Sequence, residues 1–468
     1  MQINPNTSEA YKLLHRGVLA LSRAEQQGIR IDLDYCNKAK EDLTTRIDSL
    51  EKALYDTNFY RHWSHSIGNK KPNIYSNTQL SFYLYKTKKI EPVFTTKSGQ
   101  GSTDEEALTQ LNIPELNDML AIRKLKKIRD TYLDAFTREQ VNGVIHPSFN
   151  LHLVQTFRSS SDSPNFQNIP KRDKETLKII RTGIIPRPGH QLVEIDYSGV
   201  EFRIAGCYYQ DPTMLKYIQN NSDIHGDIAS KVMQIDNFNK RDPIHAYFRS
   251  AAKNGFVFPQ LYGSWYKRCA INIACAWGGL LEKKNWKANQ GTKLADGYFS
   301  DYLLEKGINN IDKFQKHVQS VEDYYWNDIF TTGKKYQKKI WASYQKKGYI
   351  DSFTGFRYSG LMSLNQILNY PIQGSAFHCL LWSFTELDRQ IIERQWDARL
   401  NGQIHDALNG DVLPEEAKKF TALARRITCK ELPAAWDWIN VPLDVEIDIG
   451  KVDASWAEME KMEEISVF

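Results

Sequence analysis

The chain has 468 residues, of which 41% are hydrophobic and 25% are charged, and this balance is typical of a globular protein with a buried core. The composition excludes a disordered, collagenous or disulfide-scaffold protein. The net charge of +5 permits a polyanionic partner without requiring one. Six cysteines form no CxxC pair, and no stretch approaches the apolar length of a membrane span. We therefore expect free thiols, no membrane contact and a cytoplasmic location.

The charge is distributed unevenly along the chain. Residues 112–190 hold 13 Lys and Arg against 8 Asp and Glu, residues 279–350 hold the same numbers, and residues 407–468 hold 7 against 13. Lysines interleave with aromatic residues in YQKKIWASYQKKGYI (336–350), as on a surface that follows a nucleic-acid backbone. Surface helices whose aromatic residues are anchored in a core would give the same pattern.

The predicted elements, taken in chain order, are mostly helical. Apolar residues recur at three- and four-residue spacings over residues 8–55 and again over 115–136, which predicts amphipathic helices. Ser102 and Thr103 precede Glu105 and Glu106 by three residues, a capping box that predicts a helix start at Glu105. Strand-like patterns occur at 190–198, 402–413 and 441–450, widely separated by helical stretches. The chain is therefore predicted to be α+β without a regular βαβ array.

The segment LVEIDYSGVEFRIAG (192–206) carries an acidic residue at the end of a predicted strand. Alternation along the strand places Glu194 and Asp196 on one face and Val193 and Ile195 on the other. An aspartate here can simply cap the helix that follows the Ser198–Gly199 turn. The functional alternative is a ligand for a hard metal ion.

The segment NGQIHDALNGDVL (401–413) places Asp406 inside an otherwise apolar run. A buried carboxylate in a strand is costly unless it is paired or bound to metal, whereas an outward-facing one is ordinary. If Asp196 and Asp406 met on adjacent strands, they could hold two Mg²⁺ ions about 3.5–4 Å apart, the arrangement for in-line phosphoryl transfer.

The segment RSAAKNGFVFPQLYG (249–263) combines two cations with several aromatic residues. Arg249 and Lys253 are one helical turn apart and repel each other unless an anion such as a triphosphate lies between them. Two exposed cations on a surface helix are the common alternative. Phe256, Phe258 and Tyr262 follow, where a base could stack.

In chain order, the segments around Asp196, Arg249 and Asp406 resemble motifs A, B and C of family A DNA polymerases, the bacterial polymerase I group and its phage relatives. The resemblance runs from about residue 8 to the end of the chain, and this chain looks phage-type. Four further segments match in family order: TFRSSSDSPNFQNIP (156–170), SDIHGDIA (222–229), GYIDSFTGFRY (348–358) and NYPIQGSA (369–376).

The resemblance implies an α+β, right-hand polymerase fold with an antiparallel-sheet palm and largely helical thumb and fingers. It implies a template-directed DNA polymerase that extends a primer 3′-hydroxyl with dNTPs, located in the host cytoplasm if the protein is viral. The expected domains are an N-terminal helical segment (1–60), the thumb (61–155), the first part of the palm (156–220), the fingers (221–350) and the second part of the palm (351–468).

The resemblance also assigns the residues of catalysis. Asp196, Asp406 and the backbone carbonyl of Tyr197 would bind two Mg²⁺ ions, one activating the primer hydroxyl and the other bridging the triphosphate and the leaving pyrophosphate. Arg249 and Lys253 match the phosphate-binding pair, and Lys253 would donate a proton to pyrophosphate.

Further residues are assigned to the nucleotide and to the primer-template. Glu201 matches the steric gate that closes the space of a ribose 2′-hydroxyl, and Tyr262 matches the tyrosine that stacks at the template position. The remaining contacts expected from the resemblance are a phosphate contact from His225, minor-groove contacts from Arg158, Asn369 and Gln373, and a primer-terminus contact from His405.

Two departures from the family pattern stand out. Ala407 occupies the place of a usual glutamate after the second aspartate, and we expect activity to survive this loss. One residue is inserted between Lys253 and Tyr262, so that the nucleotide-stacking aromatic is Phe258 if counted back from Tyr262, with Phe256 as second choice. Counting forward from Lys253 leads to Val257 instead. Pro259 cannot donate to the carbonyl of Gly255, and a kink or π-bulge would absorb the insertion.

The polymerase-like helices begin almost at the first residue, so we expect no 3′–5′ exonuclease domain; proofreading would come from a separate protein or be absent. Residues 267–300 match the family poorly and either serve a partner or have diverged. Two rival functions are a single-subunit RNA polymerase, against which Glu201 and the QNIP (167–170) and PIQG (371–374) segments argue, and an inactive replisome component that binds primer-template, against which the intact motif residues argue.

Overall fold

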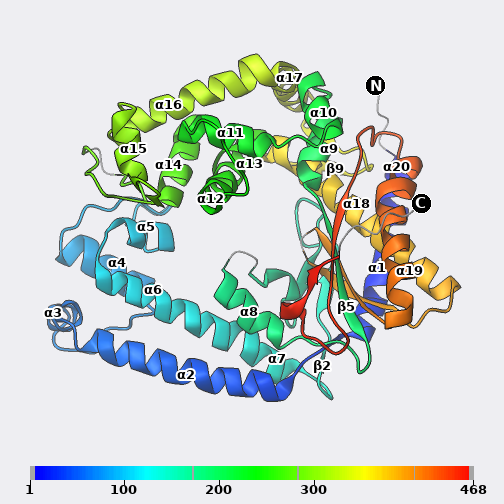
Figure 1. Ribbon diagram of the computed structural model, residues 1–468, viewed down its shortest axis with the longest axis horizontal. Helices are drawn as coiled ribbons and strands as arrows, with labels where there is room; N and C mark the ends of the chain where they lie inside the picture. Colours follow the sequence, from blue (N-terminus) through cyan, green and yellow to red (C-terminus); the bar gives the residue numbers. More distant parts are fainter. Residues whose placement is uncertain (1–5, 171–172, 282–283, 405, 463–468) are drawn as a thin grey trace. The chain divides into compact units, whose positions relative to one another are not determined.

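The computed structural model describes residues 6–170, 173–281, 284–404 and 406–462. The chain forms two compact units, each assembled from separated stretches. Unit 1 comprises Met1–Glu41, Ile128–Ser222 and Phe330–Phe468, and unit 2 comprises Asp42–Lys127 and Asp223–Ile329. Helices predominate and the strands pair antiparallel (Figure 1), so the predicted α+β class is confirmed.

A five-stranded antiparallel sheet with strand order β10-β11-β5-β12-β13 organises unit 1. Its strands are β5 (Gln191–Tyr197), β10 (Arg399–Ile404), β11 (Ala407–Val412), β12 (Val445–Ile449) and β13 (Glu460–Lys461). The strands predicted at 190–198 and 441–450 are present. The stretch predicted at 402–413 is instead two strands, because the chain turns at Asp406 and Ile404 then pairs with Ala407. Asp406 therefore stands at a hairpin turn and not within a strand.

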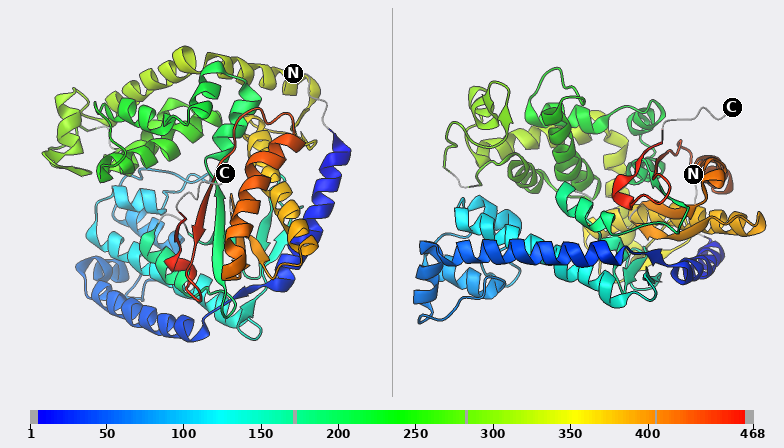
Figure 2. Two further views of the ribbon diagram at one scale, coloured as in Figure 1. Left: turned by 45° about the vertical axis from the view of Figure 1, so that its right-hand side comes forward. Right: turned by 60° about the horizontal axis from the view of Figure 1, so that its bottom comes forward.

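Helices cover the face of the sheet to which the apolar residues of β5 point. Val193, Ile195 and Tyr197 are buried, and the Tyr197 hydroxyl is 2.8 Å from the Ser383 hydroxyl on α18 (Leu364–Glu393). Figures 1 and 2 show α18 and α19 (Pro414–Arg426) running along this side of the sheet. Burial of each such aliphatic side chain contributes roughly 1.5–3 kcal/mol. Asp196 consequently lies on the opposite face.

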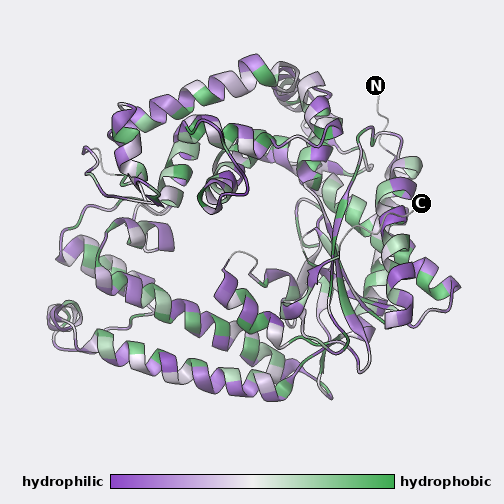
Figure 3. Cartoon of the chain, viewed as in Figure 1, coloured by the Kyte–Doolittle hydropathy of each residue, from purple (hydrophilic) through white to green (hydrophobic). Residues whose placement is uncertain are grey.

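The N-terminal helix packs closely on the same layer. Helix α1 (Thr7–Gln27) contacts α18 and β10, and a Cβ atom at Gly17 would come within 2.9 Å of Leu381. The absence of a side chain at Gly17 therefore permits this close approach. Helices α1 and α2 (Leu33–Tyr55) confirm the helical prediction for residues 8–55. Hydrophobic and hydrophilic residues alternate along α2 in Figure 3, as expected of an amphipathic helix.

Unit 1 contains further helices and short strands. They are β1 (Ile29–Arg30), η2 (Ile128–Leu133), α7 (Asp134–Glu139), β2 (Val144–Ile145), β3 (Ser148–Asn150), β4 (Ser160–Asp162), η3 (Phe166–Asn168), α8 (Lys174–Thr182), α9 (Val200–Tyr209), α10 (Pro212–Gln219), α17 (Thr331–Lys347), β8 (Tyr349–Asp351), β9 (Arg357–Ser359), η6 (Ile427–Glu431), α20 (Leu432–Ala435) and η7 (Trp456–Glu458).

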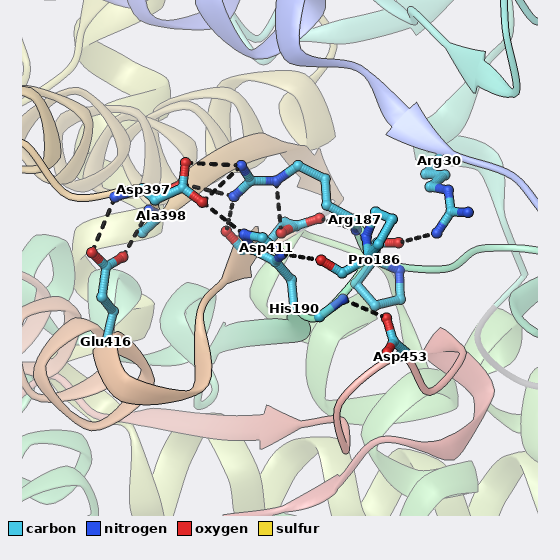
Figure 4. Close-up of polar contacts among 11 residues, drawn as sticks. Arg30, Pro186, Arg187, His190, Asp397, Ala398, Asp411, Glu416 and Asp453 are labelled. Atoms are coloured by element: carbon cyan, nitrogen blue, oxygen red, sulfur yellow. Dashed lines mark hydrogen bonds and ion pairs between the residues drawn. The ribbon is translucent and has the colours of Figure 1, made fainter.

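An arginine-centred network fixes the start of β5. Arg187 donates from Nε to Asp411 at 3.1 Å and from Nη1 to Asp397 at 3.1 Å, and its backbone N–H donates to Asp411 at 2.7 Å. His190 Nε2 lies 2.7 Å from Asp397, and the backbone N–H of Gly189 bonds to Asp453 (Figure 4). The network joins the loop before β5 to the residues just before β10 and to the last residues of β11. It thereby helps to fix the register of β5 against β11, which sets the position of Asp196.

Unit 2 is almost entirely helical. Its elements beyond α2 are α3 (Asn58–Ser66), α4 (Asn77–Ser81), η1 (Phe82–Thr87), α5 (Glu105–Gln110), α6 (Pro114–Lys127), α11 (Ile224–Met233), α12 (Pro243–Ala252), η4 (Lys253–Val257), α13 (Phe258–Leu261), α14 (Tyr266–Trp277), β6 (Lys293–Leu294), β7 (Gly297–Tyr298), α15 (Phe299–Glu305), α16 (Ile311–Asp323) and η5 (Tyr324–Ile329).

Helix α5 begins at Glu105 as predicted, but the capping box is wrong. The N-cap is Asp104, whose carboxylate accepts from the backbone N–H of Ala107 at 2.8 Å. The Ser102 hydroxyl instead accepts from the backbone N–H of Asp104 at 3.2 Å. An aspartate adjacent to the helix reaches the first-turn amides more directly than the serine two residues earlier.

All six cysteines are free thiols, as predicted. Within the described ranges, no helix combines the length and apolar character needed to span a bilayer.

Candidate active site

Asp196 and Asp406 lie side by side at one end of the unit 1 sheet. Asp196 is directly opposite Ala407 in the β5–β11 pair, and the backbone N–H of Tyr197 donates to the Asp406 carbonyl at 3.1 Å. Both aspartates are partly exposed, whereas Ala407 is fully buried. The fold thus brings together two acidic residues that are far apart in the sequence, with Asp406 at the hairpin turn beside the end of β5.

An arginine supplies positive charge between the candidate gate and the second aspartate. Arg158 Nη1 lies 3.6 Å from a Glu201 carboxylate oxygen, and its Nη2 lies 3.6 Å from an Asp406 carboxylate oxygen. The Glu201 side chain is 16% exposed and extends from the first turn of α9. The sequence predicted Arg158 at the minor groove of a primer-template; the structure places its guanidinium within reach of two other predicted site residues.

A further carboxylate that the sequence reasoning missed lies across the sheet from Asp196. Glu446 of β12 is directly opposite Asp196 and is 2.5 Å from the Lys461 ammonium. The hydrogen bond to Glu446 raises the pKa of Lys461, and the charge of Asp196 acts in the same direction. The signal available in the sequence was the alternation in VEIDI, which places Glu446 and Asp448 on one face of a strand.

The oxygen donors at the end of β5 suit a Mg²⁺ ion. Asp196 and Asp406 offer carboxylates and Tyr197 a backbone carbonyl, and hard cations prefer oxygen ligands. In the described part of the chain, no three or more His, Cys, Asp or Glu side chains are grouped so that they could hold a metal ion by themselves. A Mg²⁺ site does not require one, because this ion is commonly bound by one or two carboxylates together with substrate phosphates and water.

The side chain of Tyr197 has a separate, structural role. It is buried, and burial raises the pKa of its hydroxyl well above the ordinary value. The neutral phenol anchors β5 to α18 through Ser383. On the face of the sheet that carries Asp196, Tyr197 can therefore contribute only its backbone.

In unit 2, Arg249 and Lys253 lie one turn apart, as predicted. The backbone N–H of Lys253 donates to the carbonyl of Arg249, which continues α12 into η4. Arg249 Nε also bonds to both carboxylate oxygens of Asp223, at 2.9 and 2.7 Å. Burial opposes the ionisation of Asp223, but the hydrogen bond and charge of Arg249 outweigh it and lower the Asp223 pKa.

Asp223 is a second residue that the sequence reasoning missed. It is the N-cap of α11, where it accepts from the backbone N–H of Gly226 at 3.1 Å. It thereby joins the start of α11 to the arginine of α12. The signal was an aspartate at the N-cap position of the SDIHGDIA segment.

A π-turn lies between Lys253 and Tyr262, where the sequence led us to hypothesise a kink or π-bulge. The segment η4 (Lys253–Val257) is a π-helix, and the backbone N–H of Phe258 donates to the Lys253 carbonyl five residues earlier. Beyond the π-turn, the backbone N–H of Tyr262 donates to the carbonyl of Phe258, four residues earlier, at 3.1 Å, as in a regular α-helix. A Cβ atom at Gly255 would come within 2.9 Å of Ile273, so glycine allows this turn to pack against α14.

The π-turn places the three candidate stacking residues in different environments. Phe256 and Val257 are fully buried, and Phe256 packs against Tyr325. Phe258 instead lies on the same side as Lys253, whose ammonium is 5.5 Å from its ring centre. The Phe258 and Tyr262 rings are nearly parallel, 9° apart, with centroids 6.2 Å apart. The arrangement favours Phe258, the first choice from the sequence, as the aromatic next to the cations.

His225 lies against this cationic and aromatic face. Its ring centroid is 5.8 Å from that of Phe258. Burial, followed by the charges of Lys253 and Arg249, lowers the pKa of His225 to about 3, and the charge of Asp223 only partly opposes this. The imidazole is therefore neutral at physiological pH, so it can offer a hydrogen bond without adding charge.

Asn369 and Gln373 are one turn apart on α18, and both are partly buried. The Asn369 Oδ1 atom is buried and has no hydrogen-bond partner among the described residues. Such an acceptor is costly unless another group donates to it, which fits a residue that contacts a ligand. The prediction for His405 lies outside the described residues.

Residues 33–458 match the sequence model of DNA polymerase family A. The chain belongs to this family.

Relatives include the DNA polymerase I of Synechocystis sp. (27% identical over 450 residues; 94% of this chain and 41% of the relative), of Deinococcus radiodurans (27% over 436; 92% and 40%) and of Caldicellulosiruptor bescii (26% over 453; 94% and 46%). The chain thus spans less than half the length of these curated relatives. A solved structure of the POL domain of Pol1 from M. smegmatis, in complex with DNA primer-template and dNTP, is similar in fold. Its TM-score is 0.73 at 23% identity, covering 95% of this chain and 70% of that one.

Proposed function

We propose that the chain is a template-directed DNA polymerase that extends a primer 3′-hydroxyl with deoxynucleoside triphosphates. The main observation is that Asp196 and Asp406 lie side by side at the end of the unit 1 sheet. Asp196 is opposite Ala407, and the Tyr197 N–H donates to the Asp406 carbonyl. Family membership supports the reaction class.

The two carboxylates and the Tyr197 carbonyl would hold two Mg²⁺ ions, which when bound lower the pKa of the primer hydroxyl and neutralise charge on the phosphates. Arg158 keeps positive charge beside Asp406. Because Arg158 also pairs with Glu201, it holds the proposed gate carboxylate in place. Glu201 would exclude a ribose 2′-hydroxyl by occupying its space and by presenting a carboxylate acceptor already engaged by arginine.

In unit 2, Arg249 and Lys253 would bind the triphosphate. Asp223 orients the Arg249 guanidinium by bonding to its Nε, which leaves the two terminal nitrogens of that group for phosphate oxygens. Lys253 would donate the proton that the pyrophosphate leaving group requires. The Phe258 ring would stack on the incoming base and Tyr262 on the template position, with His225 as a neutral donor.

We further propose that Asn369, Gln373 and Arg158 contact the primer-template minor groove, where acceptors are nearly the same for all base pairs. The fingers are proposed to correspond to residues 221–350, and residues 61–155 to the thumb. We also propose that this 468-residue chain does not hydrolyse primers, because the polymerase-family match takes up residues 33–458. The assignment to the phage-type branch stays a prediction.

The test is extension of an end-labelled primer on a template with Mg²⁺, with dNTPs, with rNTPs and without nucleotides. We expect extension with dNTPs, at least 10²-fold weaker extension with rNTPs, and an unchanged primer without nucleotides. Equal or better use of rNTPs would support the RNA polymerase function instead. Shortening of the primer without nucleotides would contradict the absence of proofreading. Binding of primer-template with no extension would support an inactive replisome component.

A further inference from the structure

The backbone just before Arg158 adopts a left-handed conformation. Phe157 has a φ angle of 55°, a region that residues with bulky side chains rarely adopt and that persists where the surrounding structure holds it. The Phe157 N–H donates to the carbonyl of Val154 at 2.9 Å, which closes a turn. Because Arg158 is the next residue, this turn sets the direction in which the arginine side chain leaves the backbone.

Two buried side chains donate hydrogen bonds to the carbonyls of this turn. The Tyr358 hydroxyl donates to the Thr156 carbonyl at 3.4 Å, and His378 Nε2 lies 3.2 Å from the Phe157 carbonyl. A Cβ atom at Gly374 would come within 2.7 Å of the Thr156 carbonyl oxygen. Glycine at this position of α18 therefore allows the helix that carries His378 to approach the turn.

The His378 ring is held in one tautomer and one orientation. It is fully buried, and burial lowers its pKa to about 3, so the imidazole is neutral and has a single ring N–H. Since a carbonyl can only accept, the proton is on Nε2, and Nδ1 accepts from the Thr354 hydroxyl at 2.7 Å. The Phe356 ring stacks on the imidazole at 4.1 Å and packs against Phe157 at 4.9 Å. The N–H that reaches the turn is thus oriented by a hydrogen bond and by a ring contact.

We propose that His378 is a positioning residue for Arg158: it holds the Phe157 carbonyl, and the turn fixed in this way directs the Arg158 guanidinium to Glu201 and Asp406. The two terminal nitrogens of Arg158 lie 3.6 Å from those two carboxylates. The inference rests on the proposed polymerase function, in which Arg158 keeps Glu201 in place and contacts the primer-template. His378 acts on the reaction through Arg158.

A double-mutant cycle distinguishes positioning from a general contribution of His378 to the core. If His378 acts through Arg158, its replacement has little further effect once the arginine is gone. If His378 only supports the core, its replacement has the same effect with or without the arginine. Residues that act through one shared contact are non-additive, whereas independent residues are additive.

The cycle uses the full chain on primer-template with Mg²⁺, and the measurement is kcat/KM for incorporation of a single dNTP or rNTP. His378→Leu removes the donor, and His378→Gln retains an amide N–H for the Phe157 carbonyl. The matched control is Phe384→Leu, which also replaces a buried ring of α18 by leucine, roughly 9 Å further along the helix. Each variant is made with and without Arg158→Ala.

We expect His378→Leu to lower kcat/KM for the dNTP by about tenfold or more, and by less than about twofold when Arg158→Ala is present. The preference for dNTP over rNTP should fall in parallel, because Glu201 loses its partner. His378→Gln should recover most of the loss, and Phe384→Leu should have the same small effect in both backgrounds. Equal losses from His378→Leu with and without Arg158 would overturn the proposal, as would equal losses in the Leu and Gln variants.

Thr354→Val keeps the test decisive if His378→Leu does not fold. It removes one hydroxyl and with it the hydrogen bond to Nδ1, so the Nε2 proton is no longer fixed. We expect a smaller loss of kcat/KM that likewise disappears in the Arg158→Ala background. A loss that persists there would overturn the proposal.

A second measurement follows Arg158 without catalysis. In protein with isotope-labelled arginine, the Arg158 Nε–H signal in the NMR spectrum is identified by its loss in Arg158→Lys. This signal should shift in His378→Leu and stay in place in Phe384→Leu; an unchanged signal in His378→Leu would overturn the proposal. A natural protein that incorporates no nucleotide would refute the polymerase function, and the NMR signal would still decide whether His378 positions Arg158.

Discussion

Glu201 is 16% exposed and carries a carboxylate 3.6 Å from Arg158. It thus combines a partly buried acidic group with a cation that also reaches Asp406. The charge of Arg158 favours this position of the Glu201 carboxylate, and a carboxylate at this position is the physical basis of the proposed sugar discrimination.

Glu201→Ala should therefore lower the preference for dNTPs over rNTPs. We expect the ratio of kcat/KM values to fall by about 10- to 100-fold, mainly because rNTP use rises. The measurement is single-nucleotide incorporation with each nucleotide class. Glu460→Gln, an exposed change on β13, is the control, and an unchanged ratio in Glu201→Ala would refute the gate assignment.

His225 makes a prediction about acid stability. Its folded-state pKa of about 3 is below the ordinary value of 6.5, so the unfolded chain takes up the proton first as pH falls. The contribution of His225 to stability is complete above pH 6.5 and is lost between pH 6.5 and 3, at up to about 1.4 kcal/mol per pH unit. Urea unfolding at pH 7, 6 and 5 should show a steeper loss for the natural protein than for His225→Gln. Parallel pH dependences would contradict the buried, neutral imidazole.

At the scale of elements, the π-turn η4 separates a functional face from a core face. Its presence could be predicted because Pro259 and the one-residue insertion are local features of the chain. The hairpin turn at Asp406 could not, since a tight turn is usually signalled by Asn-Gly, Asp-Gly or a leading Gly and the apolar run continues through it. Alternation of side chains correctly predicted the two faces of β5, yet the pairing of Asp196 with Glu446 depends on the register between distant strands.

Phe258→Ala and Phe256→Ala form a matched pair that tests this separation. Phe258→Ala should raise the dNTP KM by about tenfold or more, because one base-stacking contact is lost, with little change in stability. Phe256→Ala should lower the free energy of unfolding by about 3–5 kcal/mol with a smaller effect on KM. Single-nucleotide kinetics and urea unfolding of both variants distinguish the two. The reverse pattern would assign nucleotide stacking to Phe256.

The Arg187 network is a second element-scale test. The Asp411 side chain is 6% exposed and depends on Arg187 for its charge partner. Arg187→Met should destabilise the chain by about 3 kcal/mol, because it leaves a buried carboxylate without its cation. Adding Asp411→Asn should recover part of that loss. If Arg187→Met and the double variant are equally unstable in chemical denaturation, the pair does not fix the β5 register.

At the scale of the whole molecule, the motif order predicted the family and the α+β class, but not the grouping of the chain into units. Residues 42–127 form one compact unit with residues 223–329, and contacts between segments so distant in sequence leave no periodic signal.

We propose that Asp196 and Asp406 together carry nucleotidyl transfer, and the rate of a single nucleotide incorporation measures their contribution. Rapid-quench measurement should be made with saturating Mg²⁺, primer-template and correct dNTP on the natural protein, Asp196→Asn, Asp406→Asn and the Glu460→Gln control. We expect a loss of about 10³-fold or more in each aspartate variant, with primer-template binding retained and the control unchanged. Incorporation at the natural rate by either aspartate variant would contradict it.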